Sequence, residues 1–179
     1  MLPSASMLRI LERSMKRAMF GLVLAATALS SGGCASALSG THDTDFDFLV
    51  EPVPAGTFQG WTNITLGEDI SSFGEAELYG VSLQVETAKS PTVTDLTFLS
   101  SLKAFAVTST GTTQLAHVSS FPRGSTTADM YIDYLGDLHP MFENDTTIHI
   151  IWTGSVNPAF TGWPSGGIWV SGDVTINLD

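Results

Sequence analysis

The chain has 179 residues and carries 18 acidic against 7 basic side chains, a formal net charge of −11. Four of the basic residues lie within the first 17 positions, so the chain from residue 34 onward keeps 3 basic and 17 acidic residues. Such an acidic surface repels phosphate groups, which excludes nucleic-acid binding driven by charge and disfavours anionic lipid headgroups.

Residues 1–33 have the pattern of an export signal. Arg13, Lys16 and Arg17 form a positively charged start, and the stretch 18–30 is uncharged and mostly apolar. Its 13 residues match the apolar core of a signal peptide, whereas a bilayer-spanning helix needs about 20 residues. Small residues then lead to Cys34, the only cysteine of the chain. We therefore expect residues 1–33 to be removed on export.

The residues around Cys34 resemble the lipobox of bacterial lipoproteins. Small residues occupy the two positions before the cysteine, while Ser31 stands where that family has a leucine. The resemblance implies cleavage before Cys34, lipid attached to its thiol, and anchoring of the protein in a membrane. Ala35 replaces the aspartate associated with inner-membrane retention, which implies the outer membrane of the cell envelope. The alternative is cleavage near residues 35–37 and secretion.

Residues 34–47 are small, polar and acidic, and we interpret them as a flexible lipidated tether ahead of a domain spanning 48–179. Asp43, Asp45 and Asp47 form a D-x-D-x-D run, as at the start of a calcium loop. The turn glycine and the distal glutamate that complete such a loop are missing. The run is accordingly a weak candidate for a divalent-cation site, and we expect no metal or cofactor.

The rest of the chain alternates apolar and polar residues in short stretches, which is typical of half-buried β-strands. The expected strands are 58–66, 79–85, 102–108, 114–119, 128–135, 147–155 and 168–178. In the second of these, Tyr79 begins the face that we expect to be buried. Gly172 predicts a β-bulge in the last strand, and Gly111 predicts a hairpin. Asp95 and Asp137 predict the N-caps of two short helical turns.

About seven short strands in a domain of this size predict an all-β fold. We expect a two-layer antiparallel β-sandwich, immunoglobulin-like in architecture, and a small closed β-barrel is the alternative. The Cys…Trp…Cys signature of true immunoglobulin domains is absent, because the chain has a single cysteine. The expected likeness is therefore one of architecture alone.

The segment 157–169, which runs into the last expected strand, places three large aromatic residues among glycine, proline and serine. These are Phe160, Trp163 and Trp169. Loops at the end of a sandwich commonly carry recognition, and exposed aromatic rings stack on sugars or anchor protein partners. The alternative is that Phe160 and Trp163 fold back and cap the core. The sequence leaves both readings open.

No pattern in the chain predicts catalysis. The four histidines (His42, His117, His139 and His149) lack metal-site spacing, and no serine lies in a nucleophile elbow. We therefore expect a lipid-anchored envelope protein with a non-catalytic binding or structural role. Its expected partners are the membrane, through the lipid on Cys34, and an envelope protein or glycan. The alternatives are an accessory subunit of an envelope assembly and an envelope hydrolase.

Overall fold

The structure, a computed structural model, describes residues 40–53, 56–66, 69–144 and 146–179, so the export signal and Cys34 lie outside the described residues. The strands of this part are β1 (Gly40–Val50), β2 (Gly56–Thr65), β3 (Ala76–Val85), β4 (Leu99–Thr108), β5 (Gly111–Val118), β6 (Thr127–Asp129), β7 (Tyr131–Ile132), β8 (Thr147–Val156) and β9 (Ile168–Leu178). Three short 3₁₀ turns accompany them: η2 (Ile70–Ser72), η3 (Leu96–Phe98) and η4 (His139–Met141). None of the segments described here forms a helix of the length and hydropathy needed to cross a membrane.

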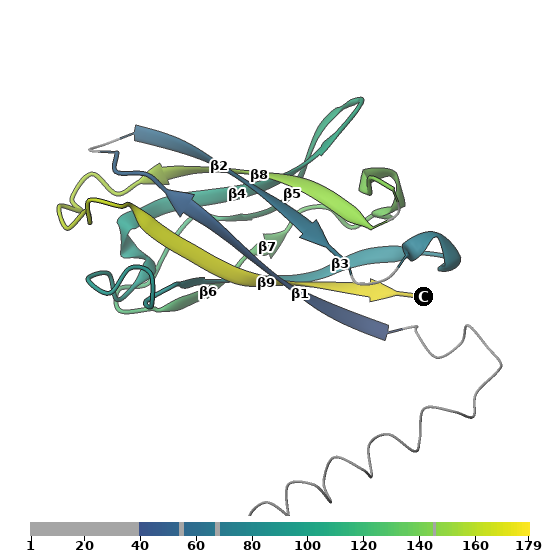
Figure 1. The fold of residues 1–179 in the computed structure, drawn as a ribbon, viewed down its shortest axis with the longest axis horizontal. Coiled ribbons are helices and arrows are strands. Elements are labelled where there is room, and N and C mark those ends of the chain that lie inside the picture. The colour runs from purple at the N-terminus through teal and green to yellow at the C-terminus, as the bar shows by residue number, and fades with distance from the viewer. Residues whose placement is uncertain (1–39, 54–55, 67–68, 145) are drawn as a thin grey trace, which may run out of the picture. The chain divides into compact units, whose positions relative to one another are not determined.

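The strands form two antiparallel sheets that lie on each other as two layers (Figure 1). The β1 sheet has the order β1-β9-β3-β6, and the β2 sheet has the order β2-β8-β4-β5-β7. The predicted two-layer antiparallel β-sandwich is thereby confirmed, and the closed barrel is not formed. Seven of the strands have eight or more residues, while β6 and β7 have 3 and 2. Six of the seven expected strands correspond to longer strands, namely β2, β3, β4, β5, β8 and β9. The expected strand 128–135 is instead divided into β6 and β7 on either side of Met130, and the long strand β1 was not expected.

The first strand corrects the predicted tether. Residues 40–47 are not a flexible linker, because β1 pairs with β9 along its whole length, from Gly40 opposite Leu178 to Val50 opposite Ile168. Phe46 and Phe48 face inward and stack on the buried Trp152, with ring centroids 4.7 and 5.0 Å apart. The aspartates of the run alternate with these inward residues and so point outward. The sandwich therefore begins at residue 40 rather than 48.

Gly172 is not a bulge, because β9 pairs without interruption through it with both neighbouring strands. Its position faces inward, where a Cβ would lie 2.0 Å from the carbonyl oxygen of Ser82 and 2.7 Å from the ring of Phe46. Only glycine fits between the backbone of β3 and this ring. Gly172 thus marks a place where the backbone of β9 comes close to that of β3, and the register of the strands does not change there.

The bulge of this sheet lies in β3 instead. The register with β9 shifts between Leu78 and Gly80, so that Leu78 and Val81 both face the core. Tyr79 consequently turns outward and is 73% exposed, which makes its predicted place in the core wrong. An inserted residue of this kind reverses the facing of every residue on one side of it, and strict alternation cannot reveal it.

The core between the sheets is apolar and continuous. Trp152 from the centre of β8 is its largest fully buried side chain, and the inward rows of β8 and β9 surround it. The chain connects the two sheets along one edge of the sandwich. There β6 pairs with β3 of the β1 sheet, and β7 pairs with β5 of the β2 sheet. Met130 lies between these two short strands, is 6% exposed, and donates its N–H to the carbonyl of Val81 at 2.8 Å.

The two predicted helical turns both form, with different caps. Asp95 is the N-cap of η3, and its carboxylate accepts the N–H of Thr97 at 3.1 Å. The N-cap of η4 is Leu138 rather than Asp137, although the Asp137 carboxylate still accepts the N–H of His139 at 3.1 Å. The predicted hairpin at Gly111 joins β4 and β5, and this glycine has a φ of 144°.

Candidate functional site

The two outer faces of the sandwich differ in charge. The strands of the β1 sheet carry six acidic residues, all exposed: Asp43, Asp45, Asp47, Glu77, Asp129 and Asp173. None of the strands of the β2 sheet contains an aspartate or glutamate. We call the outer side of the β1 sheet the acidic face. A chain that is acidic overall therefore presents one sheet whose strands bear no negative side chain.

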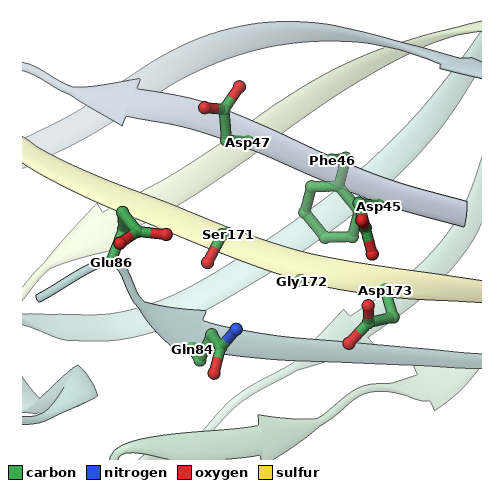
Figure 2. A pocket seen from close by; sticks show the side chains of 8 residues that line it. All are labelled: Asp45, Phe46, Asp47, Gln84, Glu86, Ser171, Gly172 and Asp173. Carbon is green, nitrogen blue, oxygen red and sulfur yellow. The ribbon is translucent and has the colours of Figure 1, made fainter. Parts of the chain in front are cut away.

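A shallow hollow of about 390 Å³ lies on the acidic face, over β1, β9 and β3. Figure 2 shows the carboxylates of Asp45, Asp47, Asp173 and Glu86 around it, with Ser171 among them. Lys89 forms an ion pair with Asp47 at 2.5 Å, and Ser82 donates a hydrogen bond to Asp173 at 3.1 Å. Several of these carboxylates are thus already bound by neighbouring side chains.

Asp45 and Asp173 lie directly opposite each other in the pairing of β1 with β9. The hydrogen bond between the two carboxyl groups, followed by the negative charges of Asp173 and Asp43, raises the pKa of Asp45 above its ordinary value of 3.8.

The aspartate run assembles no metal site within the described residues. Successive outward positions of a strand lie about 6.8 Å apart, which keeps Asp43, Asp45 and Asp47 from converging on one ion. Asp43 accepts a hydrogen bond from Thr175 at 2.6 Å, and Asp47 is bound by Lys89. No group of three histidine, cysteine or acidic side chains suited to a metal occurs in the part of the chain that the structure covers.

The outer side of the β2 sheet carries a row of large apolar side chains, and we call this side the aromatic face. Trp61 of β2 lies opposite Ile151 of β8, which in turn lies opposite Phe105 of β4. Trp61 is 61% exposed, whereas Ile151 and Phe105 are partly exposed. Neighbouring strands lie about 4.8 Å apart, so the three side chains form one contiguous stripe.

A second row runs beside this stripe and consists of polar side chains and one aromatic ring. Its members, paired strand by strand, are Gln59, Thr153, Lys103, His117 and Tyr131. Tyr131 is 76% exposed, and its ring lies 5.8 Å from the ring of His117. The aromatic face thus offers exposed rings at both edges of the sheet, Trp61 on β2 and Tyr131 on β7.

Three histidines bind carboxylates of the connection from β7 to β8. His117 Nδ1 lies 2.8 Å from Asp133, His139 Nδ1 lies 2.5 Å from Asp137, and His149 Nε2 contacts Glu143. Burial alone would raise the pKa of Asp133, but hydrogen bonds from Gln114 and His117 outweigh it and lower that pKa. These pairs hold the connection against the sheets.

The histidines do not assemble into a catalytic group in the described residues. His117 lies opposite Lys103 and His149 lies opposite Val107, which puts them four residues apart along β4 and on different neighbouring strands. The Nε2 atom of His117 has no hydrogen-bond partner in the described part of the chain, so no serine continues the His117–Asp133 pair.

The three aromatic residues of the predicted binding loop lie in two different places in the structure. Phe160 and Trp163 fold back on the buried Phe98, with ring centroids 5.9 and 6.1 Å away, and contact each other at 5.5 Å. Both rings are half-buried and cover the end of the core. Trp169 lies apart from them in β9, on the outer side of the β1 sheet, with Lys89 4.4 Å from its ring centre.

Sequence reasoning missed the aromatic face. The signal for Trp61 was present, because Phe58, Gly60 and Ile64 mark the inward row of β2 and leave Trp61 on the other side. The signal for Phe105 was weaker, because β4 is apolar on both sides, with Leu102, Ala104 and Ala106 facing inward. These residues form one row because of the order of the strands in the sheet. The alternation of apolar and polar residues along each strand does not reveal that order.

No protein-family model and no curated protein matches the chain. Among solved structures, the chain is similar to a structure of infectious bursal disease virus, Gx strain (TM-score 0.37, 12% identity), over 84% of this chain and 37% of that one. It is also similar to a two-domain protein of unknown function from Bacteroides fragilis (TM-score 0.34, 10% identity), over 79% of this chain and 46% of that one. A structure of tomato aspermy virus gives a TM-score of 0.31 at 9% identity, over 92% and 94% of the two chains.

The chain spans less than half the length of the first two of these structures. With TM-scores of 0.31 to 0.37, the similarities carry no argument about function. The fold of this protein defines its class, a two-layer antiparallel β-sandwich, and its function must be argued from its surfaces.

Proposed function

We propose that the protein is a non-catalytic binding module of the bacterial cell envelope, anchored to the outer membrane by lipid on Cys34. The observation that carries the proposal is the aromatic face. Trp61, Ile151 and Phe105 form a contiguous apolar stripe on a sheet whose strands bear no acidic side chain. An apolar patch rimmed by polar residues is typical of a binding surface.

The shape of this surface favours binding over catalysis. The stripe lies on a regular sheet, which holds its side chains in fixed positions without enclosing a substrate. The acids and histidines beside it are bound to one another, since His117 contacts Asp133 and His149 contacts Glu143. A rigid face of this kind is suited to holding a partner in place.

The anchor is supported by the order of the leader: basic start, apolar stretch, small residues and then Cys34. Intact mass of the chain extracted from bacterial membranes tests it. We expect the mass of a chain that begins at Cys34 and carries diacylglycerol, and we expect Cys34→Ala to leave the membrane fraction. Normal membrane retention of Cys34→Ala, or an unacylated mass, contradicts the anchor.

The binding role is tested separately with the Cys34→Ala variant, so that a lipid anchor cannot cause the chain to sediment with the membranes. The protein is mixed with the cell-envelope fraction of its own organism and sedimented. We expect co-sedimentation that Trp61→Ala reduces about tenfold, as the loss of an anchoring aromatic does in other interfaces. Tyr79→Ala is the matched control, since Tyr79 is 73% exposed on the opposite sheet. No co-sedimentation, or equal losses in the two variants, contradicts the proposal.

A further inference from the structure

We infer that the aromatic face binds a neutral polysaccharide chain, with Trp61 and Tyr131 as its two stacking platforms. The inference rests on the proposed function and names the chemical class of its ligand. Five features carry it: the placement of the two exposed rings on the β2 sheet, the polar groups between them, the hollow beside Tyr131, the balance of charge and the size of the apolar stripe.

The two rings stand at opposite edges of a five-stranded sheet. Trp61 on β2 is 61% exposed and Tyr131 on β7 is 76% exposed. Four strand spacings of about 4.8 Å separate β2 from β7, or about 19 Å in total. The face of an aromatic ring carries negative charge density, which attracts the polarised C–H groups on the flat side of a sugar ring. Two rings at this separation suit an extended ligand better than a single small molecule.

The polar row between the platforms supplies hydrogen-bonding groups. The side chains of Gln59 and Thr153 have no hydrogen-bond partner in the described part of the chain, and both belong to the row that ends at Tyr131. Lys103 occupies the next position and is exposed. An amide and a hydroxyl can both donate to and accept from sugar hydroxyls, and an ammonium can donate to them.

The face continues past Tyr131 into a hollow of about 400 Å³. Its walls include the hydroxyl residues Ser119, Ser120 and Ser125, together with His117 and Tyr131. The one acid that lines it, Asp129, comes from the neighbouring sheet. A chain ligand crossing from Trp61 to Tyr131 would therefore end among further groups able to bind hydroxyls.

The charge of the molecule favours an uncharged ligand. The chain has a net charge of −11, which repels anionic polymers at long range. On the aromatic face the strands bear no acid, and the loop acids Asp133 and Glu143 at its rim are each bound to a histidine. A neutral polymer meets neither attraction nor repulsion here, so its binding should depend little on salt.

The size of the apolar stripe disfavours a protein partner. A stable protein interface covers about 800 Å² on each side and has an apolar centre. The stripe consists of three side chains, of which Ile151 and Phe105 are only partly exposed. A second copy of the chain is disfavoured too, because two bodies of the same negative charge repel each other.

The test measures retention of the full chain in detergent on insoluble or cross-linked polysaccharides. The probes are cellulose, chitin, cross-linked dextran and starch, with cross-linked alginate as the anionic comparison. We expect retention on at least one neutral probe, little change from about 0.05 to 0.5 M salt, and no stronger retention on alginate. Trp61→Ala and Tyr131→Ala should each weaken binding about tenfold, and Tyr79→Ala should leave it unchanged. Circular dichroism verifies that each variant is folded.

Three results overturn the inference: retention on none of the neutral probes, retention on alginate alone, or equal weakening by Trp61→Ala and Tyr79→Ala. If the probes fail while the envelope fraction still retains the wild-type chain and not Trp61→Ala, the ligand class is wrong and the binding role stands. If both experiments fail, the binding role itself is wrong.

Discussion

Asp45 and Asp173 face each other across β1 and β9, and the contact between their carboxyl groups raises the pKa of Asp45. A raised pKa means that the folded state binds a proton more readily than the unfolded state. The free energy of unfolding therefore falls as the pH rises from about 3.8 through the raised pKa, and the loss persists at neutral pH. The pair weakens the fold under ordinary conditions.

Replacing Asp45 by asparagine should therefore stabilise the protein at neutral pH. Asp45→Asn removes one of the two facing charges and keeps the shape of the side chain. We expect a higher Tm at about pH 7 and a smaller difference at about pH 3, below the raised pKa of Asp45. Calorimetry at the two pH values measures this, and an equal rise at both would contradict the electrostatic cause.

Asp95 should show the opposite dependence on pH. Hydrogen bonds from Thr97, and further ones from the backbone, lower its pKa below 3.8. Its contribution to stability is therefore present above about pH 3.8 and is lost as the pH falls through the lowered value. Asp95→Ala should cost about 1 kcal/mol at neutral pH and less at about pH 2. Asp95→Asn keeps a capping oxygen and should cost less, so equal losses for the two variants would count against the cap.

Gly172 should tolerate no side chain. A Cβ there would lie 2.0 Å from the carbonyl oxygen of Ser82, which belongs to the backbone of the paired strand. Gly172→Ala should lower the free energy of unfolding by about 3 kcal/mol or more, measured by urea unfolding. Gly166→Ala is the matched control, because a Cβ at that position meets nothing within 4 Å. Similar stability of the two variants would show that β3 and β9 do not approach as described.

Phe46 tests whether β1 belongs to the sandwich. The ring is 5% exposed and stacks on Trp152. Phe46→Ala should lower the free energy of unfolding by about 3–5 kcal/mol, as removal of a buried aromatic ring does. Leu135→Ala removes a side chain that is 81% exposed and should change stability by less than about 0.5 kcal/mol. If residues 40–47 were a tether, both variants would match the wild type.

Most strands of this fold were predictable because they alternate. β8 keeps its period of two from Thr147 to Val156, and β9 keeps it from Ile168 to Leu178. The hairpin at Gly111 was predictable because its signal is local. The start of β1 was missed because acids fill its outward positions and the first inward residues are small or polar. The bulge at Tyr79 was missed because it depends on the partner strand.

The candidate site was less accessible to sequence reasoning than the fold. The aromatic face joins Trp61, Ile151 and Phe105, which are separated by 90 and 46 positions and meet only through the strand order. The aromatic cluster that stands out in the sequence, Phe160 and Trp163, packs on Phe98 instead. A cluster of aromatic residues in a loop can either bind a ligand or cap the core. Contacts with residues far away in the sequence decide between the two.

The four tryptophans allow one measurement that distinguishes the possible binding surfaces. Trp61 lies on the aromatic face, Trp152 in the core, Trp163 in the loop against Phe98 and Trp169 on the outer side of the β1 sheet. Their indole N–H groups give separate signals in a ¹⁵N-resolved NMR spectrum of the full chain. The spectrum is recorded while a soluble oligosaccharide of the retained polysaccharide is added. We predict that the Trp61 signal shifts on binding and that the other three stay in place. A shift of Trp163 or Trp169 with Trp61 unmoved would contradict the assignment of the aromatic face.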